Sequence, residues 1–176
     1  FRESDVIGLD YKSQTPWEAE IEFPMLYDRY AKAYDSIILI ANSIGAYFTM
    51  LSLAEKNISH ALFISPIVDM EKLIIDMMKK WLNITEDELK SKKEVETEFG
   101  ETLSWEYLSY VKNHPIRWSV PTSILYGEKD NLTSKETITK FAEQIGATLT
   151  IMGNGEHWFH TDEQLNFLDT WVKKST

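Results

Sequence analysis

Residues 36–46 read Ser-Ile-Ile-Leu-Ile-Ala-Asn-Ser-Ile-Gly-Ala, and this stretch decides the fold that we expect for the chain. The run Ser36–Ile40 is short, apolar and nearly continuous, which is typical of a strand buried on both faces of a sheet. It leads through residues 41–45 into a helical pattern over Ser43–Lys56. A serine between small residues at such a strand-to-helix turn can take the strained backbone that a nucleophile requires. Alone, this five-residue pattern also fits an ordinary tight turn.

Four more runs of the chain have the same strand-like character, and helical patterns separate most of them. They are Asp5–Leu9, Ala61–Ile64, Ser123–Tyr126 and Thr148–Met152. An alternation of strands and helices predicts an α/β fold, with a mostly parallel sheet and helices on both of its faces.

Three further helices are expected in this core, over Trp17–Tyr34, Thr133–Gly146 and Thr161–Lys174. Pro24 should break or restart the first of them, because proline removes a helical hydrogen bond. Thr133 and Glu136 have the spacing of a capping box for the second, and Gly146 follows where a C-terminal cap belongs.

Residues 69–118 interrupt the alternation with a stretch that looks wholly helical and is too long for a single crossover. Three helices are expected in it, with the second opening at Thr85. An insertion at the carboxyl edge of a parallel sheet would cover the site where ligands bind, although extra hydrophobic core is an equally good explanation. We therefore expect an α/β core of residues 1–68 and 119–176 with a helical cap of residues 69–118.

Composition excludes several classes of site and partner. The chain has 176 residues, enough for one well-buried domain, and its net charge of −10 disfavours nucleic acid and anionic membrane surfaces. It contains no cysteine, so disulfides, thiolate metal sites and a cysteine nucleophile are excluded. No apolar run approaches the length of a membrane span, and no secretory signal opens the chain, so a cytoplasmic protein is expected. Nothing in the sequence indicates an oligomeric state.

Two polar loops complete a possible constellation around Ser43. Asp130 follows the strand predicted at 123–126, and His157 follows the strand predicted at 148–152. All three residues therefore stand at carboxyl ends of parallel strands, in the chain order serine, acid, histidine that a hydrolase triad on such a sheet requires. We predict Ser43, Asp130 and His157 as the catalytic residues.

The acid and the base each have rivals. Glu128 lies in the same loop as Asp130, and Asp69 follows the preceding strand. His160 stands close to His157, whereas the remaining histidines, His60 and His114, lie at the wrong end of a strand and in the inserted segment. A triad of this kind requires neither a metal nor an organic cofactor, and no metal-spaced cluster of His, Asp and Glu is visible, so no cofactor is expected.

From about Val6 to Val172 the sequence resembles the α/β-hydrolase superfamily. The resemblance is most specific at residues 38–46, at residues 124–130 (Ile-Leu-Tyr-Gly-Glu-Lys-Asp) and at residues 155–160 (Gly-Glu-His-Trp-Phe-His). Small bacterial esterase-like and lysophospholipase-like members with a helical cap look most similar. The resemblance implies a serine hydrolase that cleaves an ester of a small-molecule acyl substrate without a cofactor. The amide of Ile44, the residue after the nucleophile, is then one expected oxyanion donor.

The sequence departs from that family's pattern in two places. Ala41 stands where the Gly-x-Ser-x-Gly pentapeptide begins with glycine, a mild change because alanine is also small. No strand ending in a His-Gly-type oxyanion loop precedes Val6, which leads us to expect that N-terminal strands are missing from this chain. Two alternatives stay open: a non-catalytic binding or regulatory protein on the same fold, and an unrelated α/β domain. The second is disfavoured by the absence of a Gly-x-Gly-x-x-Gly phosphate loop.

Overall fold

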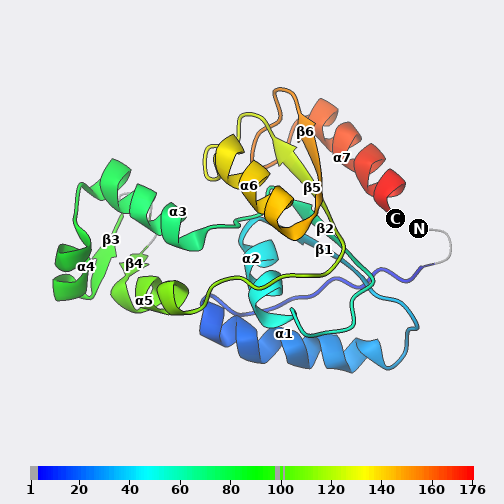
Figure 1. The fold of residues 1–176 in the computed structure, drawn as a ribbon, viewed down its shortest axis with the longest axis horizontal. Helices are drawn as coiled ribbons and strands as arrows, with labels where there is room; N and C mark the ends of the chain where they lie inside the picture. Colours follow the sequence, from blue (N-terminus) through cyan, green and yellow to red (C-terminus); the bar gives the residue numbers. More distant parts are fainter. Residues whose placement is uncertain (1–3, 98–99, 101) are drawn as a thin grey trace.

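The main sheet has four parallel strands in the spatial order β1-β2-β5-β6, in a computed structural model that describes residues 4–97, 100 and 102–176. The strands are β1 (Ile38–Asn42), β2 (His60–Ile64), β5 (Thr122–Gly127) and β6 (Thr148–Met152). Their carboxyl ends share one edge of the sheet (Figure 1). The prediction of a mostly parallel α/β sheet is confirmed.

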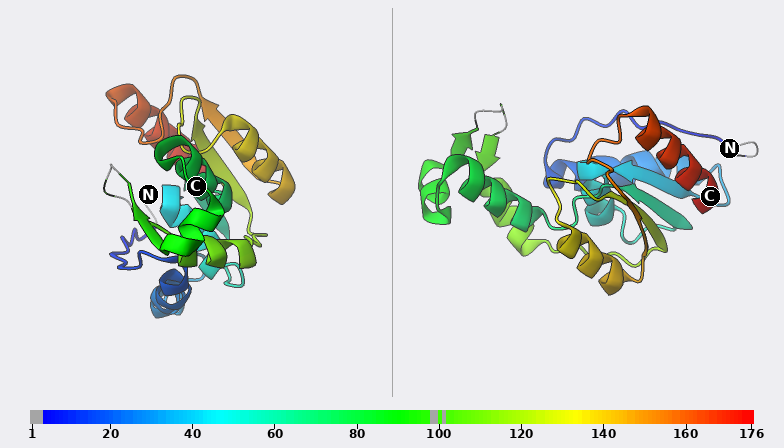
Figure 2. Two further views of the ribbon diagram at one scale, coloured as in Figure 1. Left: turned by 90° about the vertical axis from the view of Figure 1, so that its left-hand side faces the viewer. Right: turned by 90° about the horizontal axis from the view of Figure 1, so that it is seen from above.

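Helices cover both faces of this sheet. Successive strand side chains point to opposite faces, so Phe63 and Ile124 belong to one apolar cluster whereas Leu62 and Leu125 belong to another. Helices α1 (Pro16–Ala31), α2 (Ser43–Ser52) and α6 (Lys135–Ile145) pack into the first cluster, and α7 (Asp162–Ser175) packs into the second through Trp171. Figure 2 shows α6 and α7 on opposite sides of the sheet.

The prediction of a strand at Asp5–Leu9 is wrong. The chain is irregular there, and Val6, Ile7 and Leu9 are exposed. A groove of about 1070 Å³ lies between these residues and β1. Within the described residues, β1 pairs with β2 alone, so residues 5–9 have no ladder partner. Apolar composition cannot make a strand where the backbone has nothing to pair with.

Three predictions about the helices also differ from the structure. Pro24 lies inside a continuous α1, which is held against α2 by the buried side chain of Phe23. The predicted helix at 43–56 ends at Ser52. Ser134 rather than Thr133 caps α6, because its hydroxyl accepts the backbone N–H of Thr137 at 3.2 Å. Gly146 ends α6 in the left-handed conformation, as predicted.

The inserted segment between β2 and β5 is not wholly helical. It contains α3 (Met70–Met77), a π-helical turn (Met78–Leu82), α4 (Glu86–Lys92), an antiparallel hairpin of β3 (Glu94–Glu96) and β4 (Thr102–Ser104), and α5 (Trp105–Asn113). Helix α4 opens at Thr85 as predicted, and Thr85 forms a capping box with Glu88. The hairpin pairs Val95 with Leu103, and Leu103 is buried in the shared core. In Figure 1 the inserted segment extends away from the sheet, toward the left of the view.

Aromatic contacts join the inserted segment to the core. The ring of Trp17 on α1 packs edge-on against Tyr107 and Tyr110 of α5, at centroid distances of 5.9 and 5.3 Å. The Tyr110 hydroxyl also donates a hydrogen bond to Glu20 of α1. No helix among the described residues is long and apolar enough to cross a membrane.

Candidate active site

Ser43 stands at the turn between β1 and α2. Its φ of +49° is in the left-handed region, which is uncommon for a residue with a side chain. This conformation makes an abrupt turn from strand to helix, and the residue is only 7% exposed. Ser43 Oγ lies 2.8 Å from Nε2 of His157, close enough for a hydrogen bond.

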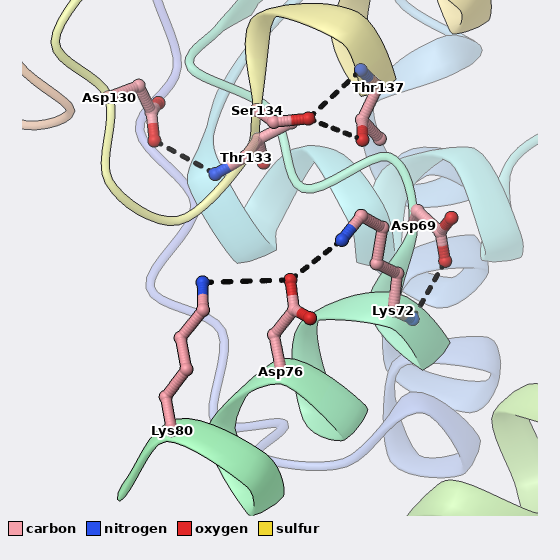
Figure 3. Close-up of polar contacts among 8 residues, drawn as sticks. All are labelled: Asp69, Lys72, Asp76, Lys80, Asp130, Thr133, Ser134 and Thr137. Atoms are coloured by element: carbon pink, nitrogen blue, oxygen red, sulfur yellow. Dashed lines mark hydrogen bonds and ion pairs between the residues drawn. The ribbon is translucent and has the colours of Figure 1, made fainter.

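His157 and Asp130 continue the hydrogen-bonded line away from Ser43. His157 Nδ1 lies 2.7 Å from Asp130 Oδ2, and these two side chains are 1% and 0% exposed. The other carboxylate oxygen, Oδ1, accepts the backbone N–H of Leu132 at 2.8 Å. It also accepts the backbone N–H of Thr133 at 3.0 Å (Figure 3). The structure therefore brings together all three residues that we predicted, from the turns after β1, β5 and β6.

The rival acids lie elsewhere. The Asp69 carboxylate accepts the backbone N–H of Lys72 at 2.9 Å and caps α3 (Figure 3). Glu128 points to solvent, with its nearest ion-pair partner, Lys135, at 3.9 Å.

The other histidines have partners outside this line. His160 is exposed and pairs with Glu156 at 3.2 Å. His60 bonds to Ser123 at 3.0 Å, at the opposite edge of the sheet. His114 bonds to the carbonyl of Tyr110 at 2.8 Å in the inserted segment.

The loop after β5 carries Asp130, and the loop after β6 carries His157. The backbones of these two loops are joined at Gly127 and Gly155. The amide of Lys129 donates to the carbonyl of Gly155 at 2.8 Å, and the amide of Glu128 donates to the carbonyl of Met152 at 3.0 Å. A Cβ on Gly127 would lie 2.6 Å from the Gly155 carbonyl oxygen, so no other residue fits there without movement. The contact therefore holds the loop that carries Asp130 against the loop that carries His157.

Two buried side chains, Tyr126 and Phe159, anchor the loops that carry Asp130 and His157. Tyr126 Oη donates to the Thr133 carbonyl at 2.8 Å. Burial, followed by the Asp130 carboxylate, raises the pKa of Tyr126 to about 12, so the phenol keeps the proton that it donates. Phe159, two residues after His157, takes a φ of +38° and buries its ring in the cluster beneath α7. These contacts anchor the segments that carry Asp130 and His157.

The N-terminal end of α2 adds an electrostatic feature beside Ser43. No side chain caps the helix, because Asn42 makes no capping hydrogen bond. The first amides of a helix have no partner within it and carry a partial positive charge, so they favour an anion at that end. The Ile44 amide belongs to this first turn, where the sequence predicted an oxyanion donor.

Several residues that shape the site had no distinct signal in the sequence. Gly127 and Gly155 look like ordinary loop glycines until their mutual contact is seen. Phe159 reads as one more apolar residue, since a positive φ cannot be deduced from residue type alone. Among the described residues, no group of three or more His, Asp or Glu side chains is placed to hold a metal ion.

No family model matches the sequence, and no curated protein matches it either. Solved structures match well. Est1E from Butyrivibrio proteoclasticus is 20% identical, with a TM-score of 0.73 over 92% of this chain and 69% of Est1E. Alpha/beta hydrolase domain-containing protein 10 from mouse is 14% identical, with a TM-score of 0.69 over 95% of this chain and 73% of the mouse chain. A further structure shows ferulic acid bound to Est1E, again at a TM-score of 0.69, with 21% identity over 92% of this chain and 68% of that one.

At identities this low, the similarity establishes the fold and leaves the chemistry to be argued from the site. The chain therefore has the fold of the α/β-hydrolase superfamily.

Proposed function

We propose that the protein is a serine hydrolase that cleaves a carboxylic ester by way of an acyl-enzyme. The observation that carries the proposal is the hydrogen-bonded line from Ser43 through His157 to Asp130. Each member has the partner that its role requires: a base for the nucleophile, and a carboxylate that orients the base. The strained backbone at Ser43 supports the same assignment, because such strain collects at functional sites.

The two half-reactions use one proton route. His157 Nε2 removes the hydroxyl proton of Ser43 while Oγ bonds to the substrate carbonyl carbon, and the carbonyl electron pair moves to oxygen. The Ile44 amide stabilises that oxyanion. When the bond to the leaving alcohol breaks, His157 returns the proton to the alcohol oxygen. Water then attacks the acyl-enzyme by the same route, which releases the acid and restores the Ser43 hydroxyl.

The substrate that we propose is a small-molecule ester with an apolar or aromatic acyl group. The inserted segment 69–118 leaves the sheet at the carboxyl end of β2, between the strands that precede Ser43 and Asp130. We propose that it caps the site and supplies apolar side chains to the acyl group. Because Est1E has been solved with ferulic acid, methyl ferulate is a reasonable aromatic substrate to set beside short aliphatic p-nitrophenyl esters.

Labelling with a fluorophosphonate probe tests the enzyme class without knowledge of the substrate. We expect one probe per chain, located on Ser43 by peptide mass spectrometry, because an activated serine is what such reagents modify. Ser43→Ala should abolish labelling. A folded protein that is not labelled would instead favour a non-catalytic binding role on the same fold.

Gly127→Ala is expected to lower kcat about 100-fold, since a displacement of about 1 Å at a catalytic group costs that much. The new Cβ would meet the Gly155 carbonyl oxygen at 2.6 Å and push the two loops apart. Overpacking of this kind should also cost about 1–3 kcal/mol in the free energy of unfolding. Ester hydrolysis and thermal unfolding measure the two effects.

Gly153→Ala is the matched control, on the loop that carries Gly155. Its Cβ would find nothing nearer than a side-chain oxygen of Glu128 at 3.9 Å, an ordinary contact. Activity and stability close to those of the parent protein are therefore expected. Equal losses in Gly127→Ala and Gly153→Ala would contradict a specific role for the contact between Gly127 and Gly155.

A further inference from the structure

Ser65, the residue after β2, combines two unfavourable features. Its side chain is 0% exposed and its hydroxyl has no hydrogen-bond partner. Its φ of +42° is also in the left-handed region. A buried hydroxyl without a partner and a non-glycine residue at positive φ both cost stability. When such costs coincide at one residue, a functional reason is the first explanation to test.

The sheet order places Ser65 between Ser43 and Asp130 at the carboxyl edge of the sheet. Ser43 follows β1 and Asp130 follows β5, and β2 lies between these two strands. The imidazole of His157 bridges Ser43 and Asp130, which stand at the strand ends on either side of β2. Ser65 is the first residue beyond the carboxyl end of β2.

Hydrogen bonds fix the turn that carries Ser65 on both sides. On the nucleophile side, the amide of Ile67 donates to the carbonyl of Ser43 at 3.2 Å. On the acid side, the amide of Ser65 donates to the carbonyl of Leu125 at 2.8 Å. The hydroxyl of Thr133 also donates to the carbonyl of Pro66, at 3.4 Å. The turn therefore cannot shift without moving the catalytic groups.

The Ser65 hydroxyl is distinct from the other orphan hydroxyls of the protein. Within the part of the chain that the structure describes, the remaining buried hydroxyls without a partner lie on helices: Tyr47 and Ser52 on α2, and Tyr107 and Ser109 on α5. Ser65 is the one that stands at the carboxyl end of a strand, where the triad residues are.

We propose that Ser65 is a positioning residue that stabilises the protonated form of His157, a role that rests on the serine hydrolase function proposed above. His157 becomes an imidazolium only after it has taken the Ser43 proton. The site is nearly dry, with His157 and Asp130 side chains 1% and 0% exposed, so a fixed dipole acts strongly there. A hydroxyl that is committed to no other group turns its oxygen toward the cation. The hydroxyl stabilises the neutral imidazole much less than the imidazolium, so it lowers the free energy of the transition state more than that of the ground state.

Ser65→Ala tests this role because it removes the hydroxyl and keeps the buried site closed. We expect kcat and kcat/KM to fall together by about 10- to 100-fold with KM unchanged, as for the loss of a hydrogen bond to a charged group. The rate of fluorophosphonate labelling should fall in parallel, since labelling also needs His157 as base. Tm should stay the same or rise, because an unpartnered buried hydroxyl has been removed.

Two variants separate the hydroxyl from the backbone and from burial in general. Ser65→Gly should lose as much activity as Ser65→Ala. Its Tm should be about 2–4 °C higher than that of Ser65→Ala, since glycine adopts a positive φ without strain. Ser52→Ala removes an orphan hydroxyl at the far end of α2, about 13 Å along the helix from Ser43, and should leave kcat unchanged.

The role is overturned if Ser65→Ala keeps kcat within twofold of the parent. It is also overturned if the loss appears as a raised KM, or if Ser65→Gly restores activity. The proposed function fails separately, because its test is Ser43→Ala. An inactive Ser43→Ala beside a fully active Ser65→Ala removes the role of Ser65 alone.

Discussion

Replacing Ser43 by alanine is expected to lower kcat for a chromogenic ester by about 10⁶-fold, to the rate that binding and oxyanion stabilisation sustain by themselves. In the proposed mechanism Ser43 Oγ is the atom that forms the acyl bond, and this hydroxyl lies 2.8 Å from His157 Nε2. KM should change little, because the hydroxyl makes its contribution in the transition state. Initial rates measured with active-site titration of the parent protein provide the comparison.

The fold should survive this change. The variant loses one hydrogen bond between neutral groups, worth about 1 kcal/mol, and alanine occupies less space at a buried position. His157→Ala should reduce kcat to a similar extent, and the double variant should be no slower than either single one, because the pair acts as a unit. His160→Ala is the matched control, since its ring is exposed and pairs with Glu156. Substantial residual activity in Ser43→Ala would place the nucleophile elsewhere.

Asp130→Asn is expected to lower kcat by about 10⁴-fold while the protein stays folded. Asp130 Oδ1 accepts two backbone N–H groups, from Leu132 and Thr133. An asparagine must keep its carbonyl oxygen at that position, so its NH₂ group takes the place of Oδ2 and faces His157 Nδ1. It then donates to Nδ1, which forces the proton onto Nε2, and Nε2 can no longer accept the proton of Ser43.

Two substitutions at the rival acids are the controls for this prediction. Asp69→Asn should keep near-parental activity and stability, because asparagine caps a helix as well as aspartate does. Glu128→Gln should do the same, since that side chain is exposed and its nearest cation lies 3.9 Å away. Kinetics on the same ester rank the three variants. A loss in Asp69→Asn comparable to that in Asp130→Asn would contradict the assignment of the acid.

Short apolar strands were readable from the sequence because burial on both faces leaves a nearly continuous apolar run. The runs at 61–64, 123–126 and 148–152 lie within one residue of β2, β5 and β6 at each end. The same rule failed at Asp5–Leu9, where the residues are apolar but the backbone has no partner among the described strands. Local composition records which side chains prefer burial, and it does not record whether a neighbouring strand is present.

The prediction that the inserted segment is wholly helical failed for a related reason. Residues 94–104 were expected to be helical, yet they contain the hairpin of β3 and β4. Two strands of three residues each are too short to show a period of two. Their pairing depends on Leu103 reaching the buried cluster, which is a tertiary contact. Pro24 was misread in the opposite direction, because packing of α1 on α2 offsets the hydrogen bond that proline removes.

The sequence by itself determined the identity and order of the three polar residues at strand ends, because the carboxyl ends of parallel strands must meet at one edge. Which carboxylate bonds to His157 was decided only by the tertiary structure, in which the backbones of Leu132 and Thr133 aim Asp130 at the ring while Asp69 caps a helix. The close contact of Gly127 with Gly155 and the orphan hydroxyl of Ser65 were likewise decided there. Hydrogen-bond distances of this kind depend on the packing of segments far apart in the chain, which no local pattern of residues encodes.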